Sequence, residues 1–178
     1  MLAEADGSAA EADRVRSELV EALGDGATEV RTPEARPLWR WRDGVSLAVA
    51  AARGTKLSED IVVPPDRLGE AIEQTLAIGD RHGLEACSWG HAGDGNLHAS
   101  FLLDAGDEEQ RRRANLAAEN LFELALRLGG SVTGEHGIGV LKAGWLSRQL
   151  DPAALAAQRS IKAALDPKGL FNPGKKEP

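Results

Sequence analysis

Two short stretches of this sequence combine residue types that bind metal ions. Residues 91–98 place His91 and His98 on either side of a glycine-rich segment, and residues 134–139 set Glu135 beside His136 between glycines. Imidazole and carboxylate groups are common ligands of zinc, manganese and iron. His91, His98 and Glu135 are therefore candidate ligands of one divalent ion. His136 cannot easily reach the same ion from an extended backbone and is a candidate base.

The spacing of the two histidines has a geometric explanation if residues 93–96 form the loop of a β-hairpin. Their sequence, Gly-Asp-Gly-Asn, suits a tight turn. His91 then lies directly opposite His98, and directly opposed Cβ atoms are about 5 Å apart, so both rings can reach one ion. Three protein ligands leave a position open for water or substrate, as in catalytic sites. Spacing alone leaves a second interpretation open, a solvated or hydrogen-bonded histidine pair without metal.

Other chemical motifs are few. Arg42 follows Trp39 and Trp41 and has a guanidinium group suited to a two-point grip on a carboxylate, although the sequence pattern alone favours a surface charge beside two partly buried tryptophans. The sequence has no Gly-x-Gly-x-x-Gly after a strand and no Gly-Lys-Ser/Thr loop, so it has no visible nucleotide-phosphate site. Neither Cys87 nor Ser88 lies in a nucleophile elbow, which argues against a serine or cysteine hydrolase.

Composition narrows the class of protein. The 178 residues are 42% hydrophobic and 28% charged, which is typical of a folded domain. The net charge of -7 argues against nucleic acid or an anionic membrane as a partner. We find no run of about 18 apolar residues that could span a membrane, and no secretory signal at the N-terminus. The expected location is the cytoplasm, which the single cysteine fits.

The elements that must position these residues follow from the apolar pattern and from helix-end signals. Helices are predicted at residues 9–23, 66–82, 107–128 and 152–165. Strands are predicted at residues 2–5, 61–63, 86–92 and 97–103, the last two joined as the hairpin. Residues 45–52 fit either a strand or a buried helix. Helices alternating with hairpin-linked strands indicate an α+β fold, a ferredoxin-like sandwich whose antiparallel sheet carries helices mainly on one face.

Two of the predicted helices have an apolar stripe that should face the sheet. In the second helix, which Asp66 should cap, the stripe is Leu68, Ile72 and Leu76. In the third helix it is Leu121, Leu124 and Leu128.

With these motifs the sequence resembles the C-terminal domain of FAD-linked oxidases of the vanillyl-alcohol oxidase superfamily. The similar branch holds D-lactate, glycolate and D-2-hydroxyglutarate dehydrogenases. The matching segments occur in the family order and extend over the whole chain, at residues 38–42, 59–64, 91–98, 134–139 and 171–175. The segments at residues 91–98 and 134–139 are together highly specific for the family.

The resemblance implies a role for each residue of the two motifs. His91, His98 and Glu135 match the ligands of a divalent metal, zinc or manganese, in metal-dependent members. His136 matches the histidine proposed as the base that acts on the substrate hydroxyl. The resemblance thus favours the metal-bound interpretation of the histidine pair.

Four further positions match residues around the substrate and the flavin. Arg42 matches the arginine that binds the substrate carboxylate. Ser46 and Ser100 stand where some members have a threonine and an asparagine, which leaves the identity of the substrate open. Asn172 lies in a tail segment that in such proteins approaches the flavin.

The resemblance implies oxidation of a small 2-hydroxy acid, with hydride passing from its α-carbon to FAD. Family members carry about 200 residues of FAD-binding domain before this one. Residues 1–178 are therefore expected to be a single domain that lacks its own first elements. FAD would be bound mainly by a domain or subunit supplied in trans, and the isolated chain would be inactive. One alternative is an orphan domain that binds a metal or a hydroxy acid without activity, and a weaker one is a metal-dependent hydrolase.

Overall fold

The computed structural model describes residues 1–27, 29, 31 and 35–175 and divides the chain into two compact units, Met1–Ala48 and Val49–Pro178. The first unit contains α1 (Ala9–Leu23) and most of α2 (Ala35–Arg53). Ser8 and Glu11 form a capping box at the start of α1, because each side chain accepts a hydrogen bond from the other residue's backbone N–H. The helix predicted at residues 9–23 is confirmed to the residue.

Residues 2–5 differ from their predicted structure, and residues 45–52 adopt one of the two structures that the sequence allowed. Residues 2–5 were expected to form a strand but are irregular. A strand this short is stable only when a neighbouring strand pairs with it, and the described residues provide none there. Residues 45–52, which fitted either a strand or a buried helix, belong to helix α2. The side chain of Leu47 in this segment is 77% exposed, so the helix is not fully buried.

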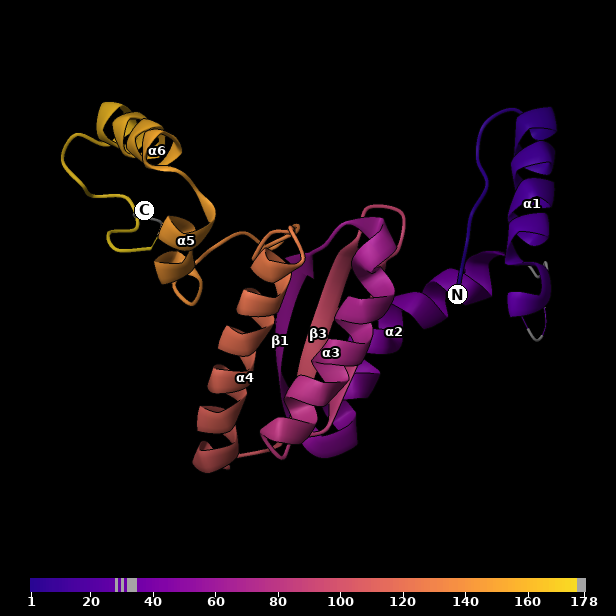
Figure 1. Cartoon of the computed structure of the whole chain (residues 1–178), viewed down its shortest axis with the longest axis horizontal. Coiled ribbons are helices and arrows are strands. Elements are labelled where there is room, and N and C mark those ends of the chain that lie inside the picture. The colour runs from indigo at the N-terminus through magenta and orange to yellow at the C-terminus, as the bar shows by residue number, and fades with distance from the viewer. Residues whose placement is uncertain (28, 30, 32–34, 176–178) are drawn as a thin grey trace. The chain divides into compact units, whose positions relative to one another are not determined.

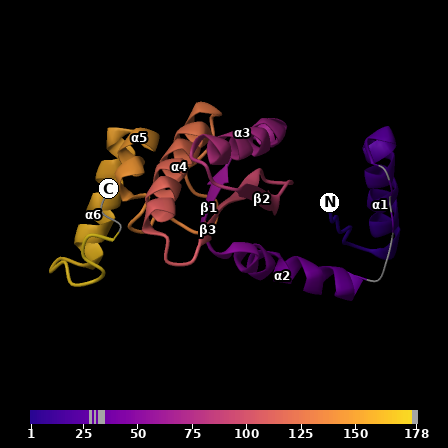
Figure 2. The ribbon, with the colours of Figure 1, turned by 90° about the horizontal axis from the view of Figure 1, so that it is seen from below.

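The second unit is built on a three-stranded antiparallel sheet. Its strands β1 (Gly54–Val62), β2 (Ala86–His91) and β3 (Asn96–Asp104) lie in the order β1-β3-β2. Figure 1 shows α3 (Leu68–Arg81) and α4 (Glu108–Arg127) side by side across one face of the sheet, and Figure 2 shows both on the same side of the strands. After α4, Ser131 forms an antiparallel bridge to Val62 on the outer side of β1. The order β1-α3-β2-β3-α4, followed by this bridge, is the ferredoxin-like connectivity with a single bridge in place of the last strand. The predicted α+β class is confirmed.

Strand β3 runs through the centre of the sheet and separates its two faces. Its odd-numbered residues from Leu97 to Leu103 are buried against the helices, in the apolar core. Its even-numbered residues from Asn96 to Leu102, which include His98 and Ser100, point to the opposite face and are also buried. Because side chains alternate along a strand, a single element thus separates the apolar core from a polar face.

The apolar stripe of α4 is confirmed, whereas in that of α3 only Leu68 packs against the core. Ile72 and Leu76 are 38% and 45% exposed, whereas the buried residues of α3 are Ala71, Thr75, Ile78 and Gly79. A Cβ atom at Gly79 would lie only 2.6 Å from the Cβ of Ala86 on β2. Small residues therefore face the sheet because the helix axis approaches it closely, and the bulkier stripe is turned away.

The predicted hairpin is confirmed, but its register is shifted by two residues. Asn96 pairs with His91, and His98 pairs with Trp89, so the loop comprises residues 92–95. Gly95 has φ +75°, and its turn packs so tightly on the end of β1 that a Cβ atom there would lie 1.9 Å from the carbonyl oxygen of Val63. His91 is consequently diagonal to His98. A shift of two residues leaves both on the same face, whereas a shift of one would have separated them.

The C-terminal part contains α5 (Leu146–Gln149) and α6 (Pro152–Leu165). The Asp151 side chain accepts a hydrogen bond from Ala154 N, which confirms the predicted start of the last helix. Asp166 then holds the tail, since its carboxylate accepts hydrogen bonds from Lys162 and from the backbone N–H groups of Leu170 and Phe171. No described helix combines the length and apolar character needed to cross a membrane.

Candidate metal-binding site

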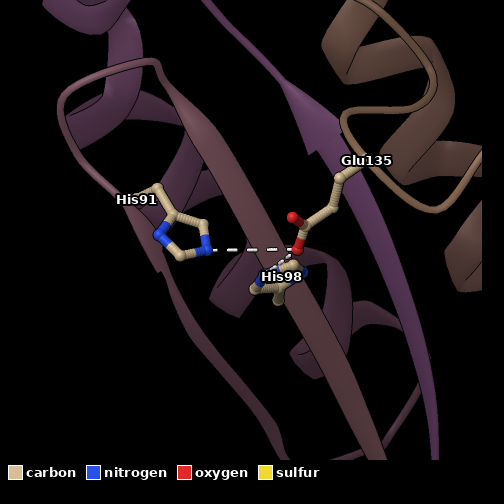
Figure 3. Close-up of side chains that lie close together, drawn as sticks. All are labelled: His91, His98 and Glu135. Atoms are coloured by element: carbon tan, nitrogen blue, oxygen red, sulfur yellow. Dashed lines mark ion pairs between the residues drawn. The ribbon is translucent and has the colours of Figure 1, made fainter. Parts of the chain in front are cut away.

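Three side chains from distant parts of the second unit meet beside the polar face of the sheet. His98 lies on β3, His91 ends β2, and Glu135 lies in the loop that follows α4. Figure 3 shows both rings directed toward one carboxylate oxygen: His98 Nε2 is 3.3 Å and His91 Nε2 is 3.9 Å from Glu135 Oε1. Each of the three residues offers one possible ligand atom, and these three atoms all lie within 4.8 Å of one another.

This geometry and donor set suit a divalent ion. Ligand atoms around a tetrahedral zinc ion are about 3.3 Å apart, given bond lengths near 2.0–2.1 Å, so the three atoms need to move little to share an ion. Two imidazoles and one carboxylate suit zinc or manganese. The His98 side chain is only 10% exposed, whereas those of His91 and Glu135 are 39% and 59% exposed. The group is therefore anchored on the sheet and accessible from one side.

His136 lies next to this group. Its ring stacks on that of His98 with the centroids 5.2 Å apart, and its Nε2 is 3.9 Å from Glu135 Oε1. Its Nδ1 is 3.8 Å from Asp60 Oδ1. The four residues that the sequence singled out in its two motifs are thus together.

Asp60 is the residue of this region to which the sequence analysis assigned no role. One of its oxygens, Oδ2, accepts hydrogen bonds from the backbone N–H groups of Gly134, Glu135 and His136 at 2.7, 2.7 and 3.0 Å. The other, Oδ1, lies 2.7 Å from Lys142 Nζ. The signal in the sequence was a charged residue directly before the apolar run at residues 61–63, and the structure shows that Asp60 is fully buried.

The charges around Asp60 compensate one another. Burial opposes ionisation of Asp60, but hydrogen bonds from Lys142 and from the loop backbone outweigh it and hold the pKa well below its usual range. Lys142 is also buried, with 2% exposure, and its Nζ lies 3.2 Å from Glu59 Oε2. Burial raises the pKa of Glu59, and Lys142 opposes this shift.

A cavity of about 190 Å³ adjoins two of the candidate ligands, and its lining includes Val62, His91, Asp94, Asn96, Gly134 and Glu135. It has room for several water molecules or for the carboxylate end of a small acid. Asn96 donates from Nδ2 to the carbonyl oxygen of Ile61, which sets the orientation of the amide. Among the described residues no group donates to its buried Oδ1.

The residues assigned to substrate and flavin lie in three different places. Ser100 is on the same face of β3 as His98, fully buried, with its Oγ 2.8 Å from Ser58 Oγ. Arg42 and Ser46 lie on α2 within the first compact unit, where Arg42 is 3.5 Å from Asp43 Oδ1. Asn172 is exposed in the C-terminal tail, with φ 46°. The structure thus groups the metal and base candidates, and Ser100 lies on the same face of β3 as His98.

The position of His98 predicts a pH dependence of the metal-free chain. Burial lowers the pKa of His98, the nearby His136 ring adds to this, and Glu135 opposes it. In the unfolded chain the ring takes up a proton near pH 6.5, but the folded chain takes it up only at lower pH, so stability should fall as the pH drops below about 6.5. Urea unfolding at about pH 7.5 and about pH 5 measures this decrease.

The matched variants are His98→Gln, which removes the group, and His82→Gln, which changes a histidine at the end of α3. We expect a smaller decrease for His98→Gln and the wild-type decrease for His82→Gln. An equal decrease in all three proteins would assign the pH dependence to other groups.

Comparison with known proteins gives consistent matches. A family described as FAD linked oxidases, C-terminal domain, matches residues 1–176. The chain is 35% identical to the glycolate oxidase subunit GlcD of Bacillus subtilis, over 98% of this chain and 38% of that protein. It is 39% identical to a probable mitochondrial D-lactate dehydrogenase of Danio rerio, over 78% of this chain and 28% of the relative. A D-2-hydroxyglutarate dehydrogenase of Stutzerimonas stutzeri is 30% identical, over 85% of this chain and 33% of that protein. The chain therefore spans about a third of the length of these relatives.

Proposed function

Because the chain belongs to the family of FAD linked oxidase C-terminal domains, we propose that it forms the substrate side of an FAD-dependent 2-hydroxy acid dehydrogenase. The observation that carries the proposal is the meeting of His91, His98, Glu135 and His136 at one end of the polar sheet face. The names of the relatives, which include glycolate oxidase and D-lactate dehydrogenase, support a small 2-hydroxy acid as substrate.

Each residue has a distinct task in this proposal. His91, His98 and Glu135 hold a divalent ion, zinc or manganese, beside the cavity. Such an ion would polarise the hydroxyl and one carboxylate oxygen of the substrate, while FAD, bound mainly by a domain outside these residues, would accept the hydride. His136 removes the hydroxyl proton as the α-carbon loses its hydride, so that the C–O bond becomes a carbonyl and the product is a 2-oxo acid.

The remaining candidates bind and orient the substrate. Arg42 grips the substrate carboxylate through two hydrogen bonds. Ser46 lies four residues later on the same helix, hence on the same helix face, and supplies a hydroxyl to the same group. Ser100, held by Ser58, supports the sheet face next to His98. Asn172 in the tail approaches the flavin.

The test reconstitutes a complete active site. The chain is purified together with an FAD-binding domain supplied as a separate polypeptide, and also as a fusion with that domain, with zinc or manganese supplied. We expect flavin absorbance to co-elute with the chain and to bleach on addition of D-lactate or glycolate. A His136→Gln variant should retain the flavin complex and the metal but reduce the flavin about 100-fold or more slowly, because it lacks the base.

Two outcomes would contradict the proposal. Flavin that co-elutes but is reduced by no 2-hydroxy acid would remove the reaction. Absence of a flavin complex in both arrangements, with metal bound by the chain, would instead favour a domain that binds a metal and a small acid without activity of its own. The cavity beside His91 and Glu135 is the observation that supports this second function.

A further inference from the structure

We propose that Asp60 is a positioning residue, whose carboxylate holds the loop at residues 133–136 so that Glu135 reaches the two histidines of the hairpin. This inference rests on the proposed function, because it takes Glu135 as a metal ligand. It concerns the link between strand β1 and the loop after α4.

The first step is the contact between Asp60 and the loop backbone. Three consecutive N–H groups, from Gly134 to His136, point at the single oxygen Oδ2, at distances between 2.7 and 3.0 Å. Successive N–H groups that converge on one anion define the backbone dihedrals of the residues between them. The direction in which the Glu135 side chain leaves the backbone is therefore set by the position of this oxygen.

The second step is the anchoring of the carboxylate itself. Asp60 is fully buried and pairs directly with His98 in the register of β1 and β3. Lys142 Nζ lies 2.7 Å from Oδ1 and 2.8 Å from the carbonyl oxygen of Asp60. Thr133 Oγ1, at the start of the loop, is 3.3 Å from Oδ1. The same strand pair that places His98 therefore also places the group that orients Glu135.

The third step is a comparison with Glu59, the neighbouring residue of β1. Both carboxylates contact Lys142 Nζ, at 2.7 Å for Asp60 and 3.2 Å for Glu59. The hydrogen bonds from the loop backbone at residues 134–136 go to Asp60. A role limited to neutralising the buried lysine would make the two residues similar, whereas a positioning role would make only Asp60 important for the metal ligands.

The experiment compares Asp60→Asn with Glu59→Gln in the full chain. Affinity for Zn²⁺ is measured by competition with a chromophoric chelator, and the ligand field is measured from the absorption bands of bound Co²⁺. We expect Asp60→Asn to bind Zn²⁺ about 10- to 100-fold more weakly, the usual effect of removing a group that orients a ligand, and to shift the Co²⁺ bands. Glu59→Gln should retain the wild-type affinity and spectrum.

Hydrogen exchange of the loop provides a readout that does not depend on metal. The amides of Gly134, Glu135 and His136 should exchange slowly in metal-free wild type and at least about 10-fold faster in Asp60→Asn, since a neutral amide oxygen accepts hydrogen bonds more weakly than the carboxylate oxygen that it replaces. If Asp60→Asn does not fold because Lys142 remains charged, a double variant with Asp60→Asn and Lys142→Met removes both charges. This double variant is then used in place of Asp60→Asn in every measurement.

The outcomes separate this inference from the proposed function. A folded variant at Asp60 with wild-type Zn²⁺ affinity and slow exchange at residues 134–136 would overturn the positioning role. If instead wild type binds neither Zn²⁺ nor Co²⁺, the metal site fails, and the exchange rates still decide whether Asp60 holds the loop.

Discussion

Replacing Glu135 with glutamine, or His91 with alanine, should remove tight zinc binding from the chain. Glu135 Oε1 lies 3.3 Å from His98 Nε2 and 3.9 Å from His91 Nε2, so loss of this carboxylate leaves two neutral ligands without a compensating charge. Loss of an orienting residue typically weakens metal binding about 10- to 100-fold, and loss of a direct ligand should exceed about 100-fold. Competition with a chromophoric chelator and metal analysis of the purified proteins measure the change.

These two positions are better targets than His98 because their side chains are 59% and 39% exposed, so the substitutions leave the core intact. His82→Gln is the matched control, since His82 contacts Asn120 with Nε2 3.0 Å from Oδ1. We expect this variant to bind zinc as wild type does. Equal zinc content in wild type and in the Glu135→Gln and His91→Ala variants would place any bound metal elsewhere.

Replacing Lys142 with methionine should destabilise the chain by about 3–5 kcal/mol, the usual cost of leaving one buried charge unpaired. Lys142 and Asp60 are 2% and 0% exposed, so water cannot replace the lost ammonium group. Methionine retains most of the volume beside the Phe122 ring, which Lys142 Nζ approaches at 5.2 Å. For a chain of this size the midpoint of thermal unfolding should fall by roughly 10 °C. Urea and thermal unfolding measure both quantities.

The difference from wild type should shrink in acid. The pKa of Asp60 is held below its usual range in the folded protein, so the stability from its pairing is present above the unfolded pKa near 3.9 and is lost as the pH falls below it. Lys168→Met, at an exposed lysine, should change stability by less than about 0.5 kcal/mol. Wild-type stability of Lys142→Met at neutral pH would show that Asp60 needs no charged partner.

Local signals in the sequence predicted several elements well. The helix at residues 152–165 has its bounds as predicted because Asp151 and Pro152 start it and Asp166-Pro167 ends it. The hairpin was predicted with a register two residues from the observed one, because the close contact between Gly95 and Val63 favours a loop at residues 92–95. That contact joins the hairpin to another strand, and a loop sequence read alone does not contain it.

The sequence by itself determined the chemistry that this chain can offer: two imidazoles, one carboxylate and a further histidine, in segments typical of one family. The sequence also predicted that His91 and His98 share a sheet face, and this is confirmed because a register error of two residues preserves the face. Only the tertiary structure decided that Asp60, 75 residues from Glu135, lies beneath the loop that carries this ligand. Caps, turns and periodicity act over a few residues, whereas the acceptor of a buried loop is chosen by the packing of distant segments.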